Sequence, residues 1–171
     1  DLEVGIEFVD ISENNLNSLK AIKEDYVDII MSGIPLTTKY AENHTVTVSY
    51  MDVDLALVVK KTKEKFFTRN QVKKDSTSTI FEVSRNEYSD GVKKVFPQTN
   101  VVKLDSVFEF YNGNRPNLDA MLTSAQEGAA WTLLYPEYKV VNPFEEPLIY
   151  PLVYTIGSSD EEFETFLNHW I

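Results

Sequence analysis

A short apolar run that opens into small and polar residues is the feature that most constrains this chain. The run from Val27 to Met31 follows an acidic entry and is succeeded by Ser32, Gly33, a proline and two threonines. This pattern predicts a buried strand that ends in a polar turn. In open α/β sheets ligands bind beyond the carboxyl ends of such strands, and a turn of small residues lets a ligand approach the backbone. An ordinary strand-to-helix loop is the alternative interpretation.

Length and composition allow one ordinary domain or two small lobes with a real core. The chain has 171 residues, of which 43% are hydrophobic, and no run approaches the roughly 20 apolar residues of a membrane helix. The net charge of −11 argues against nucleic acid and anionic lipid as partners. We therefore expect no nucleic-acid partner.

Candidate chemistry outside this stretch is sparse. Without cysteine there is no disulfide framework, no thiolate nucleophile and no cysteine-bound zinc, and the two histidines lack metal-ligand spacing. Asp52 and Asp54 could act as an acid–base pair, although a solvated strand edge is the favoured interpretation. We therefore expect no cofactor, no metal and no catalytic residues.

Apolar periodicity predicts a first series of elements in residues 1–61. Alternation over Glu3–Ile11 predicts a strand, and a short helix follows around Leu19 and Ile22. After the strand at 27–31 come a helical turn over 37–43 and a long β-rich segment, 45–61, read as one strand or two joined by a kink.

A second series follows a lysine-rich connection over 60–74. It contains strands over 80–83, 101–104, 118–122 and 138–141, which alternate with helices around Tyr88–Phe96, Val107–Tyr111 and Ala125–Leu133. Three prolines then mark an extended return segment, and a capping box at Ser159 opens a terminal amphipathic helix. This β/α alternation predicts an α/β fold with a mostly parallel, helix-covered sheet in two lobes.

The order of these motifs resembles the extracytoplasmic solute-binding proteins of family 3, the amino-acid-binding type of periplasmic binding protein. The resemblance rests on a strand with its small-residue turn, on a second-lobe pattern and on a closing helix. In this chain these segments are VDIIMSGIPLT at 27–37, Phe96-Pro97 with Val101-Val102 and NLDA at 117–120, and FLNHWI at 166–171.

The resemblance implies a type II periplasmic-binding-protein-like fold, in which two lobes close on a solute held in a cleft. Residues 1–59 plus 146–171 would form a partial first lobe and residues 60–145 the second. The family's first strand and helix would precede residue 1 and so be missing. The expected setting is periplasmic or extracellular, either free or tethered to a membrane.

Site residues follow from the same resemblance, position by position. In the first lobe, Ser32 and Gly33 match the turn that offers backbone groups to the solute's carboxylate, and Thr37 matches a threonine of the pattern. The arginine that clamps the carboxylate in the family falls at Tyr40, which cannot form that charged fork.

In the second lobe, the family's anion-binding turn reads Ser84-Arg85-Asn86, and its ammonium-binding aspartate falls at Ser124. Arg85 would add a charge at a helix start, with an ordinary surface role as the alternative. Both halves of the amino-acid clamp are replaced, which argues against a generic α-amino acid and favours a solute with a carboxylate and no ammonium group, or else a degenerate pocket. The solute class stays open between amino acids and organic acids.

These observations favour a solute-binding domain that serves a membrane permease or a fused transporter of the dicarboxylate/cation symporter kind. The segment EGAAWTLLYPEY at 127–138 carries the symporter resemblance. Two alternatives remain open: a ligand-sensing domain of a membrane receptor, and a dehydratase-like enzyme. The enzyme would need an acid–base group such as Asp52, Glu82 or Glu127, and none of them stands out.

Overall fold

The computed structural model describes residues 5–10, 18–67, 80–83, 87–104, 106–113, 120–157 and 161–171. It divides into two compact units, unit 1 with Asp1–Met51 and Pro151–Ile171, and unit 2 with Asp52–Tyr150. The chain therefore passes from one unit to the other twice. The sequence-derived lobe boundaries at 59/60 and 145/146 remain a prediction.

A central strand buried on both faces organises unit 2. Strand β3, Met51–Lys60, sends alternate side chains to opposite sides of the sheet. Leu55, Leu57 and Val59 enter a cluster with residues of helix α4, Glu87–Val95, whereas Val58 enters a second cluster on the other face. All four side chains have no exposed surface, and each such burial stabilises the fold by about 1.5–3 kcal/mol.

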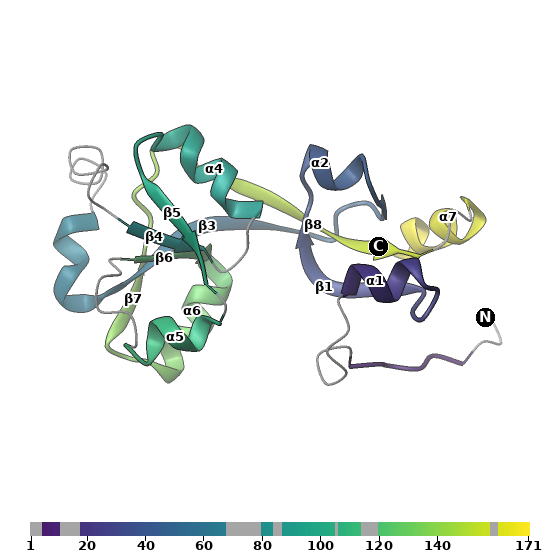
Figure 1. Ribbon diagram of the computed structural model, residues 1–171, viewed down its shortest axis with the longest axis horizontal. Helices are drawn as coiled ribbons and strands as arrows, with labels where there is room; N and C mark the ends of the chain where they lie inside the picture. The colour runs from purple at the N-terminus through teal and green to yellow at the C-terminus, as the bar shows by residue number, and fades with distance from the viewer. Residues whose placement is uncertain are drawn as a thin grey trace. The chain divides into compact units, whose positions relative to one another are not determined.

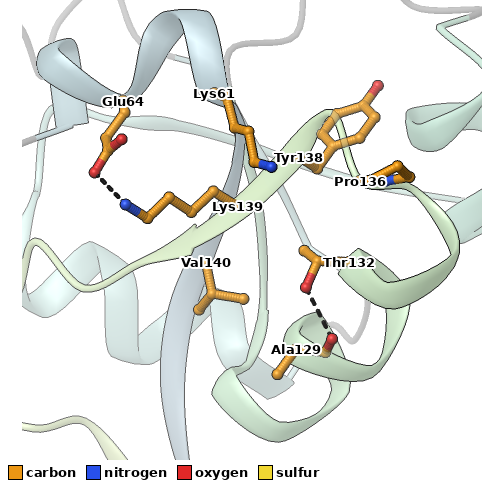
Figure 2. A pocket seen from close by; sticks show the side chains of 8 residues that line it. All are labelled: Lys61, Glu64, Ala129, Thr132, Pro136, Tyr138, Lys139 and Val140. Atoms are coloured by element: carbon orange, nitrogen blue, oxygen red, sulfur yellow. Dashed lines mark hydrogen bonds and ion pairs between the residues drawn. The ribbon is translucent and has the colours of Figure 1, made fainter.

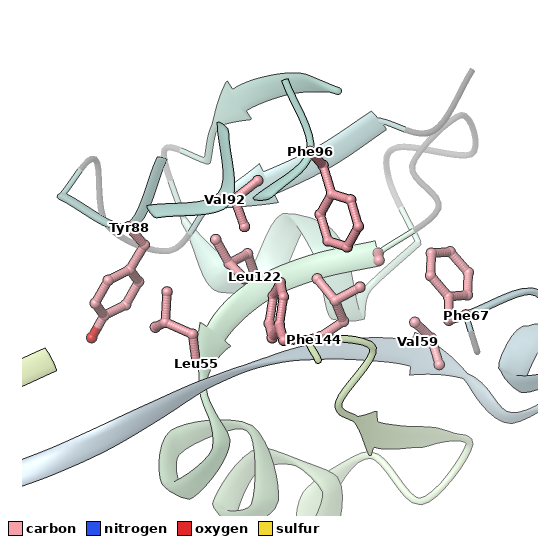
Figure 3. Packing of buried hydrophobic residues seen from close by; sticks show 10 residues of the cluster. Leu55, Val59, Phe67, Tyr88, Val92, Phe96, Leu122 and Phe144 are labelled. Carbon is pink, nitrogen blue, oxygen red and sulfur yellow. The ribbon is translucent and has the colours of Figure 1, made fainter. Parts of the chain in front are cut away.

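Helices cover both faces of this sheet, as Figure 1 shows. Tyr88 and Val92 of α4, with Phe96 just after it, pack with Leu122 and Phe144 on the first face (Figure 3). The second face is covered by helices α5, Val107–Tyr111, and α6, Ala125–Leu134. The buried stripe predicted for the helix around Tyr88–Phe96 is confirmed, except that Val95 is partly exposed.

The strands of unit 2 run in one direction apart from β3. Strand β4, Ile80–Val83, pairs in parallel with β5, Asn100–Lys103, and with β6, Ala120–Ser124. Strands β6 and β7, Tyr138–Val141, both pair antiparallel with β3, so they lie on either side of it and run parallel to each other. The 3-10 helix η1, Lys61–Phe67, continues directly from β3.

Unit 1 is built on an antiparallel sheet centred on β8, Ile149–Ile156. Its neighbours are β1, Ile29–Pro35, and β2, Thr45–Val46. The helices are α1, Ser18–Lys23, α2, Thr38–Ala41, and α7, Glu161–Trp170. Ile22, Ile30, Ile34 and Val153 form the buried cluster of this unit.

Two sequence expectations are wrong. The sheet is not mostly parallel, because β3 and β8 are return strands that pair antiparallel with their neighbours. Residues 5–10 form no strand, since no ladder with another strand includes them, and Ile6 and Phe8 are 80% and 88% exposed.

The long β-rich segment is two strands, β2 and β3, joined by residues 47–50. The predicted cap at residue 159 lies outside the described residues.

The packing of α6 on the sheet gives a first prediction, at Gly128. A Cβ added there would lie 2.8 Å from a methyl carbon of Val58, with Val140 and Thr123 at 3.2 and 3.3 Å. These three residues are β-branched and stiff, so we expect Gly128→Ala to destabilise the protein by about 1–2 kcal/mol in denaturant unfolding.

Whether Gly128→Ala lowers or raises the free energy of unfolding tests this prediction. Helix propensity alone would make alanine more stable than glycine by about 1 kcal/mol. A stabilised variant would therefore show that packing does not control this position. In a Val58→Ala background, Gly128→Ala should cost clearly less than in the wild type, because the methyl carbon nearest to the added Cβ is gone.

Candidate functional site

The predicted turn at Ser32 and Gly33 is a bulge inside a strand. Ile30 pairs with Thr155 and Ile34 with Val153, so residues 31–33 of β1 lie opposite Tyr154 alone. Gly33 has a φ of 63°, in the left-handed region that glycine adopts at little cost. The expectation of a turn that ends the strand is therefore wrong: pairing resumes through Pro35, and Leu36 N donates to Pro151 O at 2.8 Å.

Thr37 and Tyr40 lie together at helix α2 of unit 1. Thr37 is the N-cap, and its hydroxyl accepts a hydrogen bond from Tyr40 N at 3.2 Å. The Tyr40 hydroxyl is 2.8 Å from Thr155 Oγ1 on β8, and the Tyr40 ring stacks on His44 with centroids 4.4 Å apart. The geometry gives both residues a structural task, and their contact with a solute remains a prediction.

Ser124 caps helix α6 of unit 2. It is the last residue of β6, it is 6% exposed, and its hydroxyl accepts from Glu127 N at 3.1 Å. The Glu127 carboxylate accepts from Thr123 Oγ1 at 2.7 Å. Hydroxyls and a carboxylate thus meet at the junction where β6 ends and α6 begins. The sequence indicates this helix start, because Ser124 and Glu127 have the spacing of a capping box.

The segment Ser84-Arg85-Asn86 lies outside the described residues. It joins the end of β4 to the start of α4. Its role as an anion contact therefore stays a prediction. The structure groups the other predicted residues by unit, with Ser32, Gly33, Thr37 and Tyr40 in unit 1 and Ser124 in unit 2.

An aromatic cluster supports the sheet face beneath α5 and α6. The Tyr111 ring stacks on the Tyr135 ring with centroids 4.6 Å apart. The Trp131 ring also lies against Tyr111, with centroids 5.6 Å apart. The buried Tyr138 hydroxyl donates to Phe110 O at 3.1 Å. Burial raises the pKa of both Tyr111 and Tyr138, and for Tyr111 the Glu127 carboxylate adds to the effect. These tyrosines are therefore neutral packing residues at physiological pH.

A depression of about 490 Å³ lies elsewhere on unit 2, between η1, α6 and β7 (Figure 2). The Lys139 ammonium pairs with Glu64 at 2.6 Å across it. No residue of the predicted site lines it; its walls are Lys61, Glu64, Ala129, Thr132, Pro136, Tyr138, Lys139 and Val140. It therefore adds nothing to the predicted solute site.

Metal and membrane features are absent from the part of the chain that the structure describes. Within those residues no group of three or more His, Asp or Glu side chains could hold a metal ion. Among the same residues no helix has the length and apolar character needed to cross a bilayer. Of the carboxylates named as acid–base candidates, Asp52 is exposed on β3, and Glu127 accepts a hydrogen bond from Thr123.

Comparison with known proteins identifies the fold. No protein-family model matches the chain, and no curated protein sequence is significantly similar to it. Among solved structures, the ancestral amino acid-binding protein AncCDT-1, a precursor of cyclohexadienyl dehydratase, shares 21% identity with a TM-score of 0.74. That match covers 98% of this chain and 70% of the other.

Two bacterial amino-acid-binding proteins of known structure are also similar in fold to this chain. The amino acid ABC transporter substrate-binding protein AbpA of Streptococcus pneumoniae, bound to L-arginine, is 14% identical with a TM-score of 0.72, over 88% of this chain and 63% of its own. The cysteine-binding protein of Campylobacter jejuni is 19% identical with a TM-score of 0.69, over 90% and 60%. The chain therefore has the type II periplasmic-binding-protein fold, and it spans 60–70% of the length of these three neighbours.

The bulge at Gly33 gives a second prediction. Any side chain with a Cβ is strained at a φ of 63°, so Gly33→Ala should destabilise the protein by about 1–2 kcal/mol. Gly33→Asn is the matched variant, because asparagine tolerates this conformation better, and it should lose clearly less. Equal losses in denaturant unfolding would show that the backbone angle is not the cause.

Proposed function

We propose that this chain is an extracytoplasmic solute-binding domain that captures a small polar or anionic molecule for a membrane transporter. The observation that carries the proposal is the fold, which matches amino-acid-binding proteins over nearly the whole chain. Those neighbours are named for binding amino acids, and AncCDT-1 is itself called an amino acid-binding protein despite its relation to a dehydratase. Capture without chemistry is the function we favour.

The contacts of the predicted residues support this choice over an enzyme. The bulge at Gly33 and the N-caps at Thr37 and Ser124 are small, polar and fixed by backbone hydrogen bonds. Such groups suit recognition of a polar solute, since they hold donors and acceptors in place. An enzyme would require a positioned acid or base, whereas Asp52 is exposed on β3 and the Glu127 carboxylate accepts a hydrogen bond from Thr123.

The proposed partner is a permease or a transporter domain in the same gene product, of the symporter kind suggested by residues 127–138. Family resemblance supports this, together with a neighbour that is named as part of an ABC transporter. A sensor domain of a membrane receptor would have the same fold. The neighbouring domains of the full-length gene product distinguish the two, because a sensor would be joined to a signalling module.

A thermal-shift screen against amino acids, dicarboxylates, keto acids and polyamines tests the proposal. A solute that binds only the folded state raises the free energy of unfolding by RT ln(1 + [L]/Kd), about 2.7 kcal/mol at a hundredfold excess over Kd, and the thermal midpoint rises with it. We expect a hit among carboxylates, and we expect Arg85→Ala to abolish it. Arg115→Ala, which removes an arginine outside the predicted site, is the matched control.

Other outcomes correct the proposal in stated ways. A shift with ordinary amino acids that survives Arg85→Ala would mean that the carboxylate contact is misassigned. Turnover of any compound in the screen would favour the enzyme. No shift with any compound would count against solute capture by this chain.

A further inference from the structure

His44 is a partly buried titratable side chain that the proposed function does not use. It lies in the turn between α2 and β2 of unit 1. Its ring stacks on the Tyr40 ring, with centroids 4.4 Å apart and an angle of 25° between the ring planes. Both ring nitrogens are buried, and neither has a hydrogen-bond partner. Buried polar atoms without a partner are rare and costly, so this arrangement calls for an explanation.

The surroundings of His44 suit the neutral ring and not the imidazolium. The stacking partner Tyr40 is itself fixed, because its hydroxyl is 2.8 Å from Thr155 Oγ1 on β8, and Thr155 is 1% exposed. Tyr40 also packs against the buried apolar cluster of unit 1. A proton added to His44 would place a charge where neither nitrogen finds an acceptor.

The charges that face His44 work in the same direction. Desolvation lowers the pKa of His44, and the Lys23 ammonium at the end of α1 lowers it further. The titratable group stacked on His44 from α2 is the Tyr40 phenol, whose hydroxyl contacts the uncharged Thr155 hydroxyl of β8. Among the described residues, Lys23 is the charge that acts on the pKa of His44.

We propose that His44 is an acid-sensitive switch that loosens the segment 37–46 of unit 1 when it is protonated. The neutral ring supports Tyr40 through the stack, and Tyr40 in turn ties α2 to β8. Because both ring nitrogens are buried, the charged ring must move for them to reach water, and Tyr40 then loses its stacking partner. The sign follows from linkage: folding lowers the pKa of His44, so its contribution to stability is present above the unfolded value of about 6.5 and is lost as pH falls from there through the lower folded pKa.

The test compares the pH dependence of the thermal midpoint in three proteins. For the wild type we expect a loss of about 3 °C or more between pH 7 and pH 5 that is missing from His44→Phe, which keeps the stack but cannot take up a proton. The matched control is His169→Phe, which removes the other histidine, exposed on α7, and should keep the wild-type pH dependence. Identical curves for the wild type and His44→Phe would overturn the proposal.

A second measurement uses the wild-type protein and does not depend on a variant that folds. The His44 imidazole can be titrated by NMR. We expect it to titrate below the ordinary histidine value of about 6.5, and we expect the Tyr40 ring signals to shift together with it. If His44 titrates at or above that value, the switch does not exist, whatever solute the domain binds.

Discussion

The burial of β3 on both faces is the constraint on which unit 2 depends. Successive side chains of one strand fill two separate cores, so the strand must lie in the middle of the sheet and must carry apolar residues without alternation. β6 and β7 therefore pair on either side of it, and the helix between them has to cross over one face. The packing of α6, the capping of its N-terminus and the aromatic cluster beneath it all follow from that crossing.

The local patterns of the sequence allowed most of the elements to be predicted. Periodicity located α4, α5, α6 and the short strands of unit 2 to within a few residues, because each carries its own apolar face. Strand direction could not be predicted in this way. The antiparallel pairing of β3 and β8 depends on contacts with strands that are distant in sequence. No local pattern of residues indicates the direction of such a pairing.

The candidate site was predictable in residue type but not in conformation. Ser32 and Gly33 have the composition of a turn, yet Ile34 and Pro35 continue to pair with β8, which makes the same residues a bulge. The hydrogen bond between Tyr40 and Thr155 joins positions far apart in sequence, so the pattern of neighbouring residues could not predict it. Ser124 with Glu127 is different, since its spacing alone signals a helix start.

The two crossings of the chain have a consequence for how such a protein can be divided. Where unit 2 begins and ends, Leu55 N donates to Leu148 O at 2.9 Å, so the entering and leaving strands are held side by side within that unit. Residues 52–150 thus have the geometry of an inserted domain, with both ends at one place and a core of their own. A short linker across those ends would be enough to excise the unit from its host or to graft it into another loop.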